Sequence, residues 1–583
     1  ALTTGTDNVA IGENALDAVT SGADNTAVGD NALGANTTAA NNVAVGSAAL
    51  LVNTTGAANI GIGFEALKAN TTGANNVGIG KRALKTQTTA SGNVAIGLQA
   101  GELLTTGASN IAIGSYALDA ETTGQNNTAV GDSALGANAT ASNNVAVGYQ
   151  AMLANTSGTD NVAVGSNALD ANTTGADNTA IGDNALGANT TASFNTAVGA
   201  DALDANTSGA SNTAVGYLAL TANTTAANNT AVGYAAMYAN TTGASNTSVG
   251  YGALESNTTA SNNTAVGLDA LTANTTGTEN VAVGSTALDA NTTASYGVAV
   301  GYAALSANTT GANNTAVGRN ALLVNTTGNT NIAIGSLTLD ANTTGAANTA
   351  VGYDALSANT TADNNVAVGR AAMVLNTTGT DNVAMGAYAL DANTTGDDNT
   401  AIGDNALGAN TTANANTAVG SGVMFVNTSG TQNVGMGAFA LYANTTGTDN
   451  TAIGYNAMAA NTEGNSNIAI GKDALDSNTD ADYNIAIGTD ALQANTTGSS
   501  NVAIGRSVMD ANTTGGHNVA IGREALNDNT TGARNTAVGT FTMDGSTTGN
   551  DNVAVGYDAL GAGSQTGSNN VVVGNYALDA NTT

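Results

Sequence analysis

The sequence predicts an all-β protein, folded as a parallel β-solenoid of 17-residue coils. The chain repeats itself every 17 residues from Asn8 to Asn552, and one residue is inserted between Asn552 and Asn570. The 583 residues hold 34 copies, the fifth place of each copy is glycine, and each copy opens with a short β-branched run. A fixed short period is typical of coils that bury their apolar faces on their neighbours. We therefore treat residues 1–583 as one continuous repeat array.

The first element of the coil is a strand over places two to four, represented by Val162, Ala163 and Val164. Side chains alternate along a strand, so the two valines share one face and the alanine takes the other. The fourth place is Val, Ile or Met in every copy, whereas the second varies between Val, Ile and Thr. We expect Val164 and its equivalents to lie deep in the core.

The third place is almost always Ala, with occasional Gly or Ser, and Val572 in the last copy is the one larger residue. A solvent-exposed place has no reason to exclude large polar residues. We therefore expect Ala163, Ala180 and Ala197 to lie on an outer face that packs closely against other chains. This interpretation predicts an oligomer interface along the third place.

A second strand is expected over Ala168–Ala171, with Leu169 pointing into the core and Asp170 facing solvent. The ninth place is Leu or Met in every copy except that of Gly101, as a core position requires. Helix is the competing interpretation, because Ala and Leu are common. The β-branched runs, the Thr pairs and the repeated glycines oppose it.

Two turns close the coil. The fifth-place glycines, for example Gly12, Gly29, Gly46 and Gly165, end the strand and are predicted to adopt positive φ. The second turn is Asn172-Thr-Thr-Gly175. Asparagine recurs at the first and twelfth places, and two interpretations are open: amide ladders between coils, or hydrogen bonds that satisfy only the local turn.

Composition excludes several classes of protein. The absence of cysteine excludes disulfides and thiolate metal sites. Ten basic residues against 42 acidic ones, a net charge of −32, oppose binding to nucleic acid or to an anionic membrane surface. No apolar run approaches a membrane span, and no signal peptide is present. The chain begins and ends inside a repeat, so we expect an excerpt from a longer protein.

The sequence predicts no enzyme, no cofactor and no metal site. The single histidine, His517, occupies a turn place, and without a second His or any Cys a nucleophile–base pair has no components. Outward rows of carboxylates such as Asp170 and Asp204 could collect Ca²⁺. Solvation explains these rows better.

Aromatic side chains lie at the outer, variable places. Tyr217, Tyr234 and Tyr251 hold the sixth place of three successive coils, so their rings are predicted to stack near the spacing of adjacent coils. They are the candidate binding residues, for a glycan or a protein; stabilisation of the stack is the alternative. The only basic cluster is Lys68, Lys81, Arg82 and Lys85, for which a salt-bridged surface patch is favoured over an anion site.

The string Asn-(Thr/Val/Ile)-Ala-(Val/Ile)-Gly-x-x-Ala-Leu-x-Ala, as in residues 161–171, resembles the head repeat of YadA-like trimeric autotransporter adhesins. Similar repeats occur in phage tail fibres and other secreted bacterial fibres. The resemblance covers the whole chain, and it implies a left-handed β-roll, a side-by-side homotrimer and display on a bacterial cell surface. The family's usual coil is shorter than this one, and its stalk and membrane anchor are not in this sequence.

The predicted function is therefore an extracellular, adhesin-like passenger or display fibre that attaches to cells, matrix proteins, glycans or surfaces. The alternative is a purely structural filament or phage tail-fibre shaft without a ligand. Ice binding is a rival from another class, because flat Thr-bearing solenoid faces suit it. The Thr pairs here are adjacent in sequence, however, and on a strand they would point to opposite faces.

Overall fold

The computed structural model describes residues 4–561 and 565–580. It confirms an all-β parallel solenoid with one strand per coil, and the described residues contain no helix. The chain divides into two compact units, Ala1–Thr293 and Ala294–Thr583. Both units are built from the same coil, so one description of that coil serves for each.

The strands follow the sequence period. In the first unit β1 spans Val9–Ile11, β2 spans Thr26–Val28, and each later strand begins 17 residues after the one before, to β17 at Val281–Val283. The second unit runs in the same way from β18 (Val298–Val300) to β33 (Val553–Val555). The last strand, β34 (Val571–Val573), follows after one additional residue.

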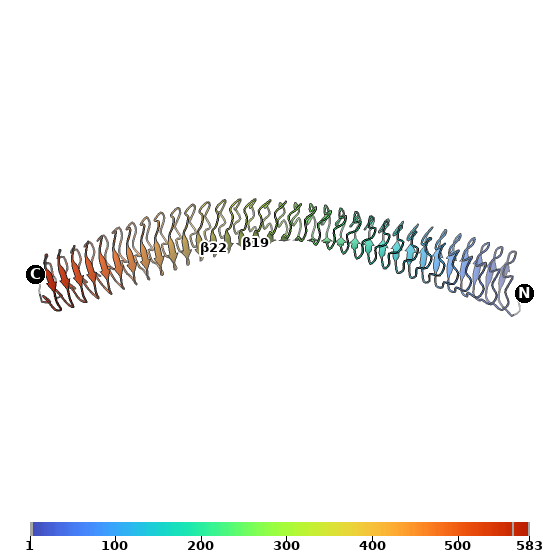
Figure 1. Ribbon diagram of the computed structural model, residues 1–583, viewed down its shortest axis with the longest axis horizontal. Coiled ribbons are helices and arrows are strands. Elements are labelled where there is room, and N and C mark those ends of the chain that lie inside the picture. The colour runs from blue at the N-terminus through green and yellow to red at the C-terminus, as the bar shows by residue number, and fades with distance from the viewer. Residues whose placement is uncertain (1–3, 562–564, 581–583) are drawn as a thin grey trace. The chain divides into compact units, whose positions relative to one another are not determined.

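Successive strands within each unit lie side by side and parallel (Figure 1). In β10 (Val162–Val164) and β11 (Thr179–Ile181), each residue pairs with the residue 17 positions later. The rest of the coil is also bonded to its neighbours, for instance from Thr173 N to Thr190 O at 2.9 Å. Hence successive coils are joined by hydrogen bonds along most of their backbone.

The predicted second strand, Ala168–Ala171, is wrong. The segment is a series of turns, and Leu169 has a left-handed backbone with φ of 56°. Its amide still donates to Ala185 O at 2.9 Å in the next coil. A left-handed leucine costs about 1–2 kcal/mol, which burial of the side chain, at about 1.5–3 kcal/mol, offsets. The inward direction predicted for Leu169 is confirmed, because the residue is 0% exposed.

The predicted faces of the first strand are reversed. Ala163, Ala180 and Ala197 are each 0% exposed within their own chain, so they cannot form the predicted oligomer interface. Val164, predicted to be core, is 36% exposed and points outward.

The reason for the small third place lies inside the coil. A Cβ added to Gly61, a third-place glycine, would lie 3.3 Å from Cγ of Leu50 in the preceding coil and 3.4 Å from the carbonyl oxygen of Ala66. The strand and the opposite wall are therefore so close that one layer of leucines fills the space between them. Small side chains therefore fit the third place without displacing that layer. Ser248 fits because its hydroxyl donates to Ala253 O at 2.7 Å, and Val572 in the last strand is the one larger residue.

Asparagine ladders form at both predicted places. At the first place, Asn161 Nδ2 lies 3.2 Å from Asn144 Oδ1, and the same amide donates to Gly175 O at 2.9 Å. At the twelfth, Asn172 Nδ2 donates to Asn155 Oδ1 at 2.9 Å and to Gly175 O at 3.0 Å. Both interpretations of these residues are thus correct together, since each amide bonds a neighbouring coil and its own turn. These bonds satisfy polar groups that are fully buried.

The fifth-place glycines are confirmed as turn residues. Gly12, Gly29, Gly46 and Gly165 have φ of 132°, 136°, 134° and 144°. A Cβ at Gly165 would lie 2.2 Å from the carbonyl oxygen of Gly182 in the next coil. Glycine is required here both by the backbone conformation and by the close approach of coils.

We predict that Ala180→Leu will destabilise its coil by about 1–3 kcal/mol, because the larger side chain collides with Leu169. Faster amide exchange in peptides covering residues 169–187, measured by mass spectrometry, checks this. Ile181→Leu is the matched control and should exchange like the unmodified chain, since Ile181 is 40% exposed. Equal exchange in the two variants would contradict the assignment of the strand faces.

Candidate functional site

The outward strand face forms a uniform surface along each unit. Its two rows are the second and fourth places, which hold only Val, Ile, Thr or Met. Most fourth-place side chains are exposed, for example 40% for Ile181 and 43% for Met385, and the others are partly buried, such as Val147. None of the 34 described strands carries a charged residue, although the chain has 42 acidic ones. An apolar surface of this extent is typical of an interface.

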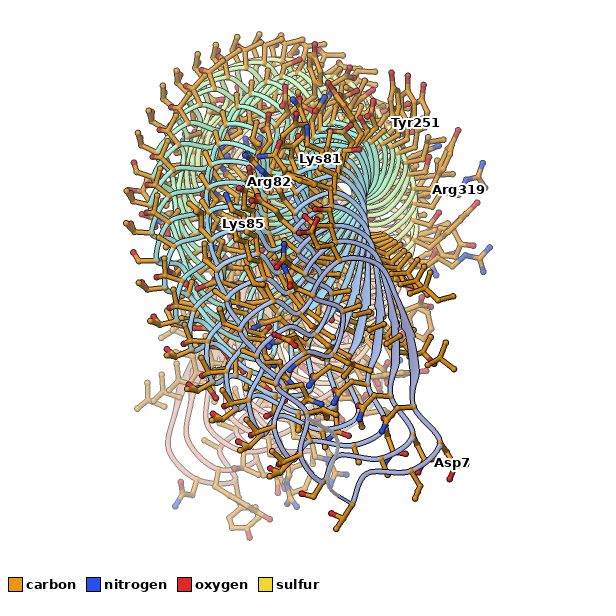
Figure 2. The ribbon with its side chains drawn as sticks, turned by 90° about the vertical axis from the view of Figure 1, so that its right-hand side faces the viewer. Asp7, Lys81, Arg82, Lys85, Tyr251 and Arg319 are labelled. Atoms are coloured by element: carbon orange, nitrogen blue, oxygen red, sulfur yellow. The ribbon has the colours of Figure 1, made fainter. Side chains whose placement is uncertain are left out.

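The predicted tyrosine stack is confirmed within the first unit. The ring centroids of Tyr217 and Tyr234 are 5.7 Å apart, and those of Tyr234 and Tyr251 are 4.9 Å apart and nearly parallel. Each ring is about half exposed, with Tyr251 at the outside of the coil (Figure 2). The in-register coils place equivalent side chains above one another. The stack therefore offers an aromatic surface with three phenol hydroxyls.

The basic cluster is a salt-bridged patch, as predicted (Figure 2). Glu65 accepts from Lys68 at 2.7 Å and from Arg82 at 3.3 Å. Lys85 Nζ lies 3.5 Å from Glu102 Oε1 in the following coil. The hydrogen bond from Lys68, and the charges of Lys68, Lys85 and Arg82, lower the pKa of Glu65. Lys68, Arg82 and Lys85 therefore already face the carboxylates of Glu65 and Glu102, whereas Lys81 forms no ion pair with the described residues.

The candidate catalytic and metal-binding residues do not come together. His517 is an exposed turn residue with φ of 61°. Among residues 4–561 and 565–580, no group of three His, Cys, Asp or Glu side chains is placed to hold a metal ion. The carboxylates of the tenth place lie along the stack, one per coil at most. No helix in the described part of the chain is long and apolar enough to cross a membrane.

Asp170, which was predicted to face solvent, and the tenth-place residue Asp204 are half-buried. Burial raises the pKa of Asp170. Burial, with the charges of Asp201 and Asp170, also raises the pKa of Asp204. The largest effect is at Asp544, where burial and the carboxylates of Asp558 and Asp528 raise the pKa to about 6. Ionisation of these tenth-place carboxyl groups therefore destabilises the folded state.

Two features escaped the sequence analysis. Glu121 replaces asparagine in the twelfth-place ladder and is fully buried; it accepts from Thr123 N at 3.0 Å, and burial raises its pKa. Phe425, Phe439 and Tyr442 surround a surface hollow at Gly422. The sequence signal for the hollow was a seventh-place glycine with Phe425 in its own coil and Phe439 and Tyr442 in the next coil.

No protein-family model matches the sequence, and no curated protein matches it. Function is therefore inferred from the geometry of these surfaces.

We predict that Asp544→Asn will stabilise the protein at about pH 8 by on the order of 1 kcal/mol. The folded state holds the proton of Asp544 more tightly than the unfolded chain does, so ionisation destabilises the fold above a pH of about 6. Below the unfolded value of 3.8 the carboxyl is protonated in both states, and the variant loses its advantage. Thermal unfolding followed by circular dichroism at about pH 8 and about pH 3 checks this. A stabilisation that persists at the lower pH would contradict the assignment to ionisation.

Proposed function

We propose that the chain is a non-enzymatic, adhesin-like passenger displayed outside a bacterial cell, and that three copies associate side by side into a fibre. The observation that carries the proposal is the uncharged, outward strand face of Val, Ile and Thr. The homotrimer is implied by the resemblance of the repeat to YadA-like head repeats. We propose the second and fourth places as its interface, because the third place is buried within its own chain.

The apolar character of the strand face supports association, because packing within the coil does not require apolar residues at the fourth place. The third place is restricted by the leucine layer, but Val164 and its equivalents point away from that layer. A strand face in water tolerates polar residues, and threonine does appear in the second row. The fourth place excludes polar side chains in all 34 strands. A partner that covers this row explains the exclusion.

Another copy of the chain is the partner that best fits a long repeating face. Solenoids with the same coil spacing can converge on a common axis with their strand faces turned inward, and every coil then buries the same kind of residue. Homo-oligomers use such matching surfaces to close under rotational symmetry. The acidic side chains lie at places outside the strand face, so the copies approach without bringing carboxylates together.

The outer, variable places are then free to meet a target. We assign attachment to these surfaces, beginning with the stacked rings of Tyr217, Tyr234 and Tyr251. Exposed tyrosines supply broad apolar contact together with a hydroxyl that bonds a protein or a glycan. A structural filament or tail-fibre shaft would share the strand-face interface but would need no such target. Ice binding would instead require the threonine-bearing strand face to remain exposed, and a thermal-hysteresis measurement separates it from the proposal.

We predict that three arginines introduced at the fourth place, Val147→Arg, Val164→Arg and Ile181→Arg, will break the assembly. Charged side chains would then be forced into an apolar interface. Light scattering coupled to size exclusion should give the mass of a trimer for the unmodified chain and of a monomer for the variant. The matched control places three arginines at the sixth place, Ser166→Arg, Asp183→Arg and Ala200→Arg, and should remain trimeric. A monomeric unmodified chain would contradict the proposal.

Attachment itself is tested with beads that carry the full chain, washed over surfaces coated with matrix proteins or glycans. We predict at least a several-fold loss of retained beads when Tyr217, Tyr234 and Tyr251 are changed together to serine, because the stacked contact surface is removed. Tyr149→Ser is the control, since that ring is exposed in the same unit, outside the stack. Beads retained no better than bare beads on every surface would favour the structural filament.

A further inference from the structure

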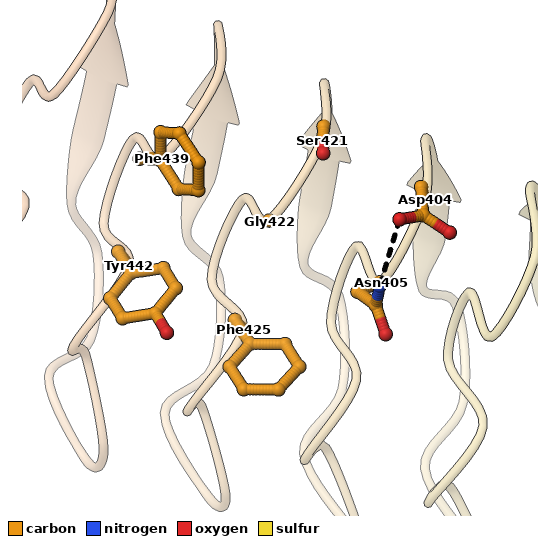
Figure 3. A pocket seen from close by; sticks show the side chains of 7 residues that line it. All are labelled: Asp404, Asn405, Ser421, Gly422, Phe425, Phe439 and Tyr442. Carbon is orange, nitrogen blue, oxygen red and sulfur yellow. Dashed lines mark hydrogen bonds between the residues drawn. The ribbon is translucent and has the colours of Figure 1, made fainter.

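The second unit contains an aromatic hollow that the proposed attachment surface does not include. We define it by the rings of Phe425, Phe439 and Tyr442 around Gly422 (Figure 3). Its volume is about 310 Å³, and its other walls come from Asp404, Asn405 and Ser421. All of these residues occupy the sixth, seventh or tenth place, so the hollow opens outside the strand face.

Two glycines create the hollow. Gly422 holds the seventh place, where the preceding coil has Asn405. A Cβ at Gly422 would lie 3.1 Å from the ring of Phe439, and a Cβ at the tenth-place Gly408 would lie 3.1 Å from the ring of Phe425. Each phenylalanine therefore lies over the bare backbone of the coil before it. A ring that packs on the backbone of the neighbouring coil exposes its other face to solvent.

The three rings form a platform with a wall. The centroids of Phe425 and Tyr442 are 5.6 Å apart, and the two planes differ by only 14°. Phe439 stands nearly perpendicular to Tyr442, at 5.8 Å and 69°. Phe439 and Tyr442 are 40% and 37% exposed. Figure 3 shows Phe425 and Tyr442 on adjacent coils, with Phe439 beside them.

The opposite edge of the hollow is polar and lacks basic groups. Asn405 Nδ2 donates to Asp404 Oδ2 at 2.9 Å, which fixes the two side chains as a pair (Figure 3). The remaining carboxylate oxygen, the amide oxygen and the Ser421 hydroxyl offer acceptors and a donor to a ligand. The sequence has no Lys or Arg between Arg370 and Lys472. An anionic ligand would therefore find only negative charge here.

We propose that this hollow binds a neutral, extended glycan. The apolar C–H face of a pyranose ring packs on an aromatic ring, while its hydroxyls require the kind of acceptors and donors that Asp404, Asn405 and Ser421 supply. The two near-parallel rings lie one coil apart, a spacing of the order of one sugar unit in an extended chain. They form an open platform, whereas a cage for a quaternary ammonium needs rings that enclose the cation on several sides. This inference rests on the proposed adhesive function and names its ligand class.

The test uses the full chain and a panel of immobilised oligosaccharides: cellohexaose, chitohexaose and poly-N-acetyllactosamine as neutral probes, and a heparin hexasaccharide as the anionic probe. Calorimetry then gives the Kd of any neutral hit, and choline is the cationic probe. We expect at least one neutral probe to bind saturably. Phe425→Ala or Tyr442→Ala should weaken that Kd tenfold or more, because each removes one ring of the platform.

Gly422→Asn gives the sharpest variant. It installs the side chain that the preceding coil carries at Asn405, where φ is 54°, close to the 63° of Gly422. The coil therefore keeps its backbone while the hollow is filled, and glycan binding should be lost. Ala371→Asn is the matched control, at the same place with φ of 52°, and should bind as the unmodified chain does.

Three results would overturn the glycan site: no binding of any neutral probe, unchanged binding by the Phe425, Tyr442 and Gly422 variants, or binding of choline or heparin alone. None of these results affects the oligomeric state. A trimer that binds no glycan therefore contradicts only this inference, whereas a monomer contradicts the proposed fibre.

Discussion

The distance between the strand and the opposite wall of the coil governs the rest of the structure. One layer of ninth-place side chains fills that space, and Leu169 reaches it from a left-handed backbone. The third place must then be small, as the contacts around Gly61 and Leu50 demonstrate. With Ala163 turned inward, alternation forces Val162 and Val164 outward. Because the interior holds only one large side chain per coil, the larger strand residues point outward and form the apolar face through which we propose that the chains associate.

The period, the fifth-place glycine and the two asparagine ladders could be predicted from the sequence, because each depends on what repeats at a fixed spacing. The stacking of Tyr217, Tyr234 and Tyr251 could be predicted for the same reason, since equal places in successive coils must lie one above another. These features need only the register of the coils. They do not depend on the path of the chain within one coil.

The faces of the strand could not be assigned from alternation alone, since both faces are apolar. The rule that large residues lie inside favoured Val164 as a core residue, whereas the narrow interior takes the small third-place residue, usually alanine. The prediction of a second strand at Leu169 was wrong for a related reason. Leucine rarely adopts positive φ, so its sequence gives no indication of a left-handed turn. The ninth-place residues adopt it because a buried leucine and bonds to adjacent coils offset the local cost.

The separation of places within the coil also explains where binding surfaces can arise. Places one, three, five, nine and twelve are fixed by ladders, tight turns or the leucine layer, so changes there disturb the neighbouring coils. The sixth, seventh and tenth places point outward and accept residues as different as Gly422, Asn405 and Phe425. Replacing one side chain by glycine at such a place opens room for a ring from the next coil, and the backbone register is kept. A repeat of this kind can therefore carry different ligand sites along its length while its strand face stays uniform.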